Sequence, residues 1–258
     1  MILELDRFTV LCGDMHGSPG NVMDKIIQCD LTDVDIIVLG DIGIWRYSDC
    51  KRGCFVLFDK FLAERNINCY AMRGNHDNPI FFTPENTHIQ VDRFWSKFTN
   101  FKRLPDYTEI NYDGRIGLAI GGGISVDRWR RSSFQKNRTV QNRFSYRNDD
   151  WWPNELVKLP PDETPKHYDF LLTHNGPTPP FLNHQSPIIK YYSEYDISLI
   201  PDIEAEQKKY ELIYKQYTPD NWFMGHYHLS DSFYYGKAKC IILNEFELSE
   251  LRLWQRLH

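Results

Sequence analysis

The stretch "VDIIVLGD" (residues 34–41) is an apolar run that ends abruptly at a glycine and an aspartate. "RFTVLCGD" (7–14) and "NCYAMRGNH" (68–76) repeat this form on either side of it. Apolar runs without polar alternation indicate strands that are covered on both faces, as in a parallel sheet. The segments between them, 19–30 and 53–66, have apolar residues at helical spacing. The chain is therefore predicted to open as βαβαβ, in the α/β class.

The rest of the chain continues with strands, but two insertions interrupt the pattern. These insertions cover about 124–167 and 176–220, and the second is expected to end in a helix over 201–217. We expect "KCIILNEFE" (239–247) and "ELRLW" (250–254) to form a closing antiparallel pair. No repeat or linker is evident, so we predict one domain over 1–258 with two cap-like insertions. The later predicted strands are "IGLAIGGG" (116–123), "YDFLLTHN" (168–175), "NWFMGHYH" (221–228) and the two closing segments.

Composition narrows the function classes. The net charge of -5 gives no whole-protein attraction to nucleic acid or to an anionic membrane. The N-terminus has no basic leader, and no segment reaches the roughly 18–20 apolar residues of a membrane span. The six cysteines are scattered without a C-x-x-C pair, and Cys12 and Cys69 lie in strand-like runs, where a reduced core cysteine is expected. We expect a cytoplasmic protein that does not bind membranes.

Polar side chains follow five of the predicted strands, in "GDMHG", "GDIG", "RGNHD", "LLTHNGP" and "GHYH". Ligand sites in α/β sheets lie outside the carboxyl ends of the strands, so these side chains can converge. Carboxylate, imidazole and amide groups without a thiolate suit a divalent transition-metal site. The adjacent glycines let the backbone turn sharply and approach closely.

In this order, D-x-H, GD, GNH[DE], a lone histidine and GHxH resemble the signature of the calcineurin-like metallophosphoesterases, from Asp14 to His228. "IGGGISVDR" with the later "WWP" looks like a branch of small bacterial and phage phosphoesterases. The resemblance implies an α/β/β/α sandwich, with mixed sheets flanked by helices and a dimetal site at the strand ends.

By this resemblance, a carboxylate and two histidines would bind the first metal: Asp14, His16 and His228. An amide and two histidines would bind the second: Asn75, His174 and His226. Asp41 would bridge the two ions, since shared negative charge suits a pair of cations. The ions would hold the phosphoryl oxygens and generate a bridging hydroxide for in-line attack. His76 would donate a proton to the leaving group.

The two divalent ions implied are manganese first, with iron, zinc, cobalt or nickel as alternatives, because these ligands suit all of them.

One motif departs from the protein phosphatase branch of the family. That branch has GDxVDRG, whose second aspartate pairs with the catalytic histidine, whereas here the sequence is "GDIGIWRYS" with Ile44 at that place. Arg46 follows and is a candidate for contacting a substrate phosphate. Asp77 is next to His76, but neighbours in a turn often point apart, so it is not given the orienting role. A dedicated Ser/Thr protein phosphatase is therefore disfavoured.

Residues 128–147 hold seven basic side chains and no acid, with aromatic residues among them. One interpretation is a lip that captures substrate phosphate or a nucleic-acid strand through arginine forks and stacked bases. The other is a solvated flap paired with acids such as Asp149 and Asp150. The candidate substrate-binding residues are Arg128, Arg130 and Arg131.

The sequence thus predicts a two-metal phosphoesterase acting on a phosphate mono- or diester, such as a phosphorylated small molecule or a nucleotide. The alternatives are a nuclease or nucleic-acid end phosphatase, a Ser/Thr protein phosphatase, and a non-catalytic metal-binding interaction module. Oligomeric state is left open.

Overall fold

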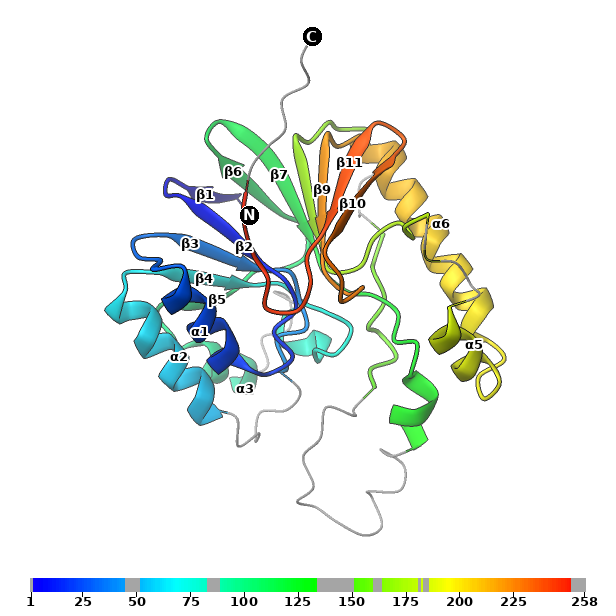
Figure 1. Ribbon diagram of the computed structural model, residues 1–258, viewed down its shortest axis with the longest axis horizontal. Coiled ribbons are helices and arrows are strands. Elements are labelled where there is room, and N and C mark those ends of the chain that lie inside the picture. Colours follow the sequence, from blue (N-terminus) through cyan, green and yellow to red (C-terminus); the bar gives the residue numbers. More distant parts are fainter. Residues whose placement is uncertain are drawn as a thin grey trace.

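Two β-sheets lie face to face, with helices on their outer sides (Figure 1). The computed structural model describes residues 2–44, 52–82, 89–133, 151–159, 164–180, 182 and 186–251. Within these residues, no helix is long and apolar enough to cross a membrane.

The five-stranded sheet has the order β12-β2-β3-β4-β5. Strands β2 to β5 are parallel, and β12 runs antiparallel to β2. The strands are β2 (Thr9–Cys12), β3 (Asp35–Val38), β4 (Asn68–Ala71), β5 (Phe101–Arg103) and β12 (Leu248–Glu250). The helices that accompany them are α1 (Pro19–Gln28), α2 (Arg52–Glu64), α3 (Ile89–Trp95) and the 3-10 helix η1 (Pro79–Phe81).

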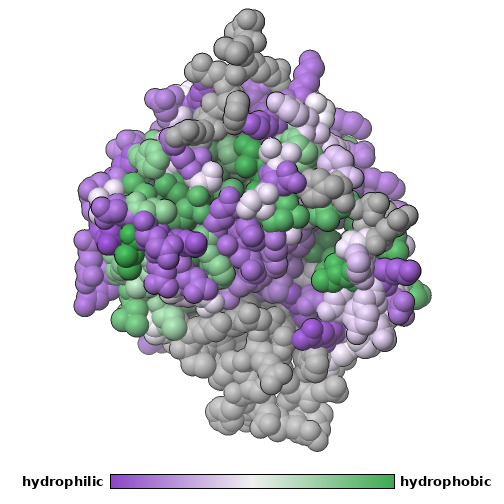
Figure 2. Space-filling view, viewed as in Figure 1, coloured by the Kyte–Doolittle hydropathy of each residue, from purple (hydrophilic) through white to green (hydrophobic). Residues whose placement is uncertain are grey.

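The seven-stranded sheet has the order β1-β6-β7-β8-β9-β11-β10, with parallel strands β7, β8, β9 and β11 at its centre. Its strands are β1 (Ile2–Leu5), β6 (Thr108–Tyr112), β7 (Arg115–Ile120), β8 (Phe170–Thr173), β9 (Asn221–Met224), β10 (Asp231–Tyr235) and β11 (Ala238–Ile242). Helix α6 (Leu199–Tyr217) covers this sheet and packs on α5 (Pro187–Ser193). Hydrophilic and hydrophobic residues are interspersed on the face shown in Figure 2, and Ile188 of α5 is exposed.

Alternate residues of the central strands enter different cores, because successive side chains of a strand point to opposite faces. In β3, Ile36 packs toward the helices of the five-stranded sheet, whereas Ile37 packs between the two sheets. In β8, Phe170 packs between the sheets and Leu171 packs against α6. Every layer of an α/β/β/α sandwich therefore has its own apolar contact surface, as the resemblance implied.

The predicted closing pair is wrong for the part that the structure describes; residues 252–254 of "ELRLW" lie outside the described residues. Strand β11 pairs antiparallel with β10 and parallel with β9, whereas β12 joins the other sheet beside β2. The turn between them, residues 243–247, carries the chain from one sheet to the other. Its backbone bonds explain the change: Phe246 N donates to Asp14 O, and Gly13 N donates to Glu247 O. Cys12 and Cys69 are buried and not in disulfides, as expected.

Candidate metal centre

The proposed ligands lie directly after five strands that the fold places side by side. Strand β2 precedes Asp14 and His16, β3 precedes Asp41, and β4 precedes Asn75 and His76. His174 follows β8, and both His226 and His228 follow β9. The two sheets thus contribute to one site, and its side chains form overlapping groups of metal-ligating type.

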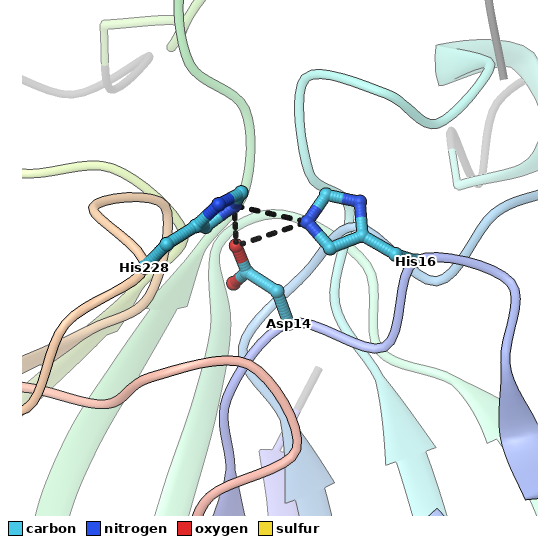
Figure 3. Close-up of side chains that lie close together, drawn as sticks. All are labelled: Asp14, His16 and His228. Carbon is cyan, nitrogen blue, oxygen red and sulfur yellow. Dashed lines mark hydrogen bonds and ion pairs between the residues drawn. The ribbon is translucent and has the colours of Figure 1, made fainter. Parts of the chain in front are cut away.

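The first group consists of Asp14, His16 and His228 (Figure 3). His16 Nε2 and His228 Nε2 are 2.9 Å apart. Asp14 Oδ2 lies 3.2 Å from His228 Nε2 and 3.7 Å from His16 Nε2. All three side chains point toward a common space (Figure 3).

The second group consists of Asn75, His174 and His226. Asn75 Oδ1 is 2.7 Å from His174 Nε2 and 3.1 Å from His226 Nδ1. The two histidine nitrogens are 3.3 Å apart. His174 is completely buried and Asn75 is almost so, which shields this group from water more than the first.

Asp41 lies between the two groups and faces each with a different oxygen. Its Oδ1 is 3.3 Å from His174 Nε2, and its Oδ2 is 3.8 Å from His16 Nε2. The carboxylate is buried, and Oδ1 also accepts a hydrogen bond from His76 N at 2.9 Å. A carboxylate in this position has one oxygen available to each of two cations.

The backbone around the site is strained. His16, Asp41, His226 and His228 all have positive φ, between 46° and 65°. Residues other than glycine seldom adopt this left-handed conformation. Where they do, they are often found at active sites and ligand-binding sites. The tight turns aim these four side chains back over the strand ends.

Glycines allow the ligands to approach neighbouring backbone. A Cβ atom at Gly74 would lie 2.0 Å from Asp41 Oδ1, and one at Gly225 would lie 2.2 Å from Asp14 Oδ1. Any side chain at these positions would displace a carboxylate from the site. Sterics therefore explain why glycine occupies these positions in "RGNHD" and "GHYH".

The donor set fits a cation. His174 Nδ1 donates to the carbonyl of Leu39 at 2.8 Å, so in the neutral imidazole Nε2 carries the lone pair. That lone pair faces two further acceptors, Asn75 Oδ1 and Asp41 Oδ1. Acceptors this close repel one another unless a proton or a cation lies between them, and oxygen and nitrogen ligands of this kind suit a divalent ion.

Electrostatics divides the histidines of the site. Burial and then the neighbouring His174 lower the pKa of His226 to about 3, although Asp41 and Asp14 raise it, so His226 is neutral. Burial also lowers the pKa of His174, but the carboxylates of Asp41 and Asp14 outweigh it and raise that pKa. Burial raises the pKa of Asp41, but His174, His76 and His16 more than offset this and leave it well below its usual range.

His76 lies beside this arrangement, with Nε2 3.8 Å from Asp41 Oδ2. Burial lowers its pKa, against the raising effect of Asp41, and the charge of Arg131 lowers it further. Among the described residues, its buried Nδ1 has no hydrogen-bond partner. Asp77 does not face this imidazole: its carboxylate accepts from the backbone N–H groups of residues 42, 43, 44 and 74. Asp77 thus fixes the loop that follows Asp41.

The candidate arginines occupy different places. Arg131 is buried, and its Nη2 contacts His76 Nε2. Arg128 pairs instead with Asp196 and Asp202 at 2.7 and 2.6 Å, which ties residues 128–133 to α6 and to the turn that precedes it. Arg130 is exposed, and Arg46 lies outside the described residues.

Three neighbours of the site escaped the sequence analysis. Glu245 Oε1 lies 3.3 Å from His16 Nε2 and 3.6 Å from His228 Nδ1, from the turn between β11 and β12. Ser125 and Glu155 lie behind Asn75. Ser125 lies in "IGGGISVDR", just after a predicted strand, but nothing there indicated a contact with Asn75, and Glu245 and Glu155 belong to none of the quoted motifs.

This α/β/β/α sandwich gathers histidines and carboxylates at its strand ends, in groups that could hold metal ions. A family model described as calcineurin-like phosphoesterase matches residues 9–230, and the chain belongs to that family. No curated protein matches the chain significantly.

The solved structures that match this chain are distant in sequence. Phosphopantetheinyl hydrolase from Mycobacterium tuberculosis is 12% identical, with 93% of this chain and 90% of that chain covered and a TM-score of 0.39. A protein serine/threonine phosphatase from Saccharomyces cerevisiae is 16% identical, with 95% and 70% covered and a TM-score of 0.36. At such low identity and TM-score, nothing about substrate follows from either.

Proposed function

We propose that the protein is a dinuclear-metal phosphoesterase that hydrolyses a phosphate mono- or diester. The observation that carries this proposal is the position of Asp41, with one carboxylate oxygen facing each ligand group. Asp14, His16 and His228 would hold one divalent ion, and Asn75, His174 and His226 the other. Manganese is our first choice for both ions. The same ligands also suit iron, zinc, cobalt and nickel.

When bound, the two ions polarise the phosphoryl group and lower the pKa of a water molecule for attack at phosphorus. His76 is the proposed proton donor to the leaving-group oxygen, since its Nε2 lies at the edge of the site beside Asp41; in this role Nε2 must first take up a proton in place of its contact with Arg131, and Asp41 is the neighbour that raises its pKa. Arg131 donates to a phosphoryl oxygen, because its guanidinium reaches the same edge and can only donate.

The substrate we propose is a phosphorylated small molecule or a nucleotide. The contacts of Arg128 with Asp196 and Asp202 support two insertions that form one cap beside the site. An acidic chain gives no general attraction to nucleic acid, which is why a nuclease is the second choice.

The test compares manganese-loaded protein on p-nitrophenyl phosphate and bis-p-nitrophenyl phosphate, with His76→Ala alongside. We expect turnover of at least one ester. His76→Ala should keep its metal and lose more turnover on a phenyl phosphate than on the p-nitrophenyl ester. The reason is that a poor leaving group depends more on a proton donor, whose contribution is about 10²–10⁴-fold.

Preference for the diester would direct the search to nucleotides, and preference for the monoester to small phosphate esters. Metal-loaded protein that turned over neither ester, nor any of a panel of nucleotides, would contradict the proposed function and favour a binding module. Equal losses on both leaving groups would remove His76 from the role of proton donor.

A further inference from the structure

A series of hydrogen bonds leads from Asn75 away from the candidate metal centre. Asn75 Nδ2 donates to Ser125 Oγ at 2.8 Å. Ser125 Oγ donates to Glu155 Oε2 at 2.7 Å, and Ser125 N donates to Glu155 Oε1 at 2.7 Å. All three residues are almost completely buried, so no bulk water competes for these bonds.

The direction of this series fixes which end of the Asn75 amide faces the centre. When Glu155 is ionised its carboxylate only accepts, so the single hydroxyl proton of Ser125 goes to Glu155. The serine oxygen then accepts, and the group that donates to it is the NH₂ of Asn75. The carbonyl oxygen of Asn75 is thereby turned toward His174 and His226, where a metal ligand is required.

Other contacts hold Ser125 and Glu155 in place. The buried guanidinium of Arg73, two residues before Asn75, donates to the carbonyls of Gly121 and Glu155 at 3.1 and 2.7 Å. A Cβ atom at Gly122, where φ is +99°, would lie 2.6 Å from Arg73 Nη2 and from Glu155 O. Only glycine permits this close approach, which brings Ser125 against Asn75.

We propose that Ser125 and Glu155 are positioning residues that orient the Asn75 amide so that its oxygen, and not its nitrogen, is presented to the second metal. This inference rests on the proposed function in taking Asn75 as a ligand. An amide needs such a device because its two ends differ, whereas a carboxylate offers an oxygen in either orientation.

This role requires the ionised form of Glu155, which burial disfavours at neutral pH. Burial raises the pKa of Glu155 to about 8, while the hydrogen bonds from Ser125 and the charge of Arg131 lower it. The ionised form is the one that accepts the serine proton, and a cation bound at Asn75 favours that form by its charge.

The test is a double-mutant cycle between positions 75 and 155, read as the affinity for the weaker of two manganese ions at pH 8. Glu155→Gln should weaken it about 10- to 100-fold, the usual effect of losing an outer partner of a ligand. Its new NH₂ donates to Ser125, whose proton then turns to Asn75 and draws the amide oxygen away from the metal. Ser125→Ala should weaken the affinity in the same direction.

Asn75→Asp decides between positioning and general structural damage. In the Glu155→Gln background, Ser125 donates to the outer oxygen of the new aspartate while the inner oxygen remains a ligand. We therefore expect Glu155→Gln to cost little affinity when residue 75 is aspartate. Glu206→Gln is the matched control, because Glu206 is equally buried nearby but bonds to Ile124, Val157 and Asn175 and not to Ser125.

Equal losses with asparagine and with aspartate at position 75 would overturn the inference, as would a loss in Glu206→Gln as large as in Glu155→Gln. A readout in metal-free protein separates this test from that of the proposed function. The side-chain amide protons of Asn75, followed by NMR, should exchange with solvent faster in Ser125→Ala than in the parent. Unchanged exchange would contradict the proposed series, whether or not the parent hydrolyses any phosphate ester.

Discussion

Arg131 and Arg130 are adjacent, yet their surroundings are opposite. Arg131 is buried against His76, with its Nε 2.7 Å from Asp127, whereas Arg130 is exposed. Arg131→Ala should therefore lower kcat/KM on a phosphate monoester about 10- to 100-fold, the usual value of a hydrogen bond to a charged group. Manganese binding should be retained, since Arg131 is not a proposed ligand.

The control is Arg130→Ala, which removes the same charge one residue away and should turn over like the parent. Steady-state kinetics on p-nitrophenyl phosphate checks both variants. If the two variants behaved alike, general charge and not the position of Arg131 would explain phosphate binding.

At the residue scale, the proposed metal ligands were the residues best predicted from the sequence, because they belong to motifs. The side chains from Asp14 to His228 gather because each directly follows a strand, and strand ends are legible as apolar runs that stop at glycine. Glu245 and Glu155 could not be found in this way, and although Ser125 also follows a predicted strand, its contact with Asn75 could not be predicted. Each reaches the site through the path of a loop, and loop paths depend on packing that no local pattern encodes.

At the scale of elements, α6 is joined to the layer beneath it by a buried carboxylate. Glu206 accepts hydrogen bonds from Ile124 N, Val157 N and Asn175 Nδ2, at 3.1, 3.5 and 3.0 Å. Burial raises its pKa to about 7, although these donors oppose the rise. The folded protein therefore holds a proton on Glu206 at a pH where the unfolded chain has lost it.

The sign of the pH effect follows. Between about pH 4.5 and 7 the folded state binds more protons at Glu206 than the unfolded state, so the free energy of unfolding falls as pH rises. Over that window the loss amounts to at most about 3 kcal/mol. Glutamine does not titrate, so Glu206→Gln should gain stability relative to the parent on going from pH 5 to pH 7.5.

Urea unfolding of both metal-free proteins at the two pH values measures this difference, in which the shared histidines cancel. A difference in stability that did not change with pH would mean that Glu206 is ionised in the folded protein throughout.

The elements themselves were predictable to different degrees. Helices α1, α2 and α6 match their predicted segments because their apolar spacing is set by a single buried face. The partner of β12 was not predictable: a short strand with half-buried residues carries no sign of the sheet it joins. Strands β1, β5, β6 and β10 were not predicted, because most of their residues are exposed or half-buried and they lack a continuous apolar run.

At the scale of the whole molecule, stacking two sheets brings β2, β3 and β4 of one to the same edge as β8 and β9 of the other. His174 from one sheet thereby meets Asp41 from the other, and Gly225 N donates to His174 O beside them. The site is a property of the sandwich, because neither sheet alone holds a complete set of ligands for either proposed ion.

The central claim is that Asp41 joins two metal positions into one centre. Electron paramagnetic resonance during a manganese titration of the metal-free protein tests it most directly. We expect two ions per chain whose spins are coupled, with the coupled signal lost in Asp41→Asn. Two uncoupled ions, a single ion per chain, or a coupled signal that survived Asp41→Asn would contradict the account.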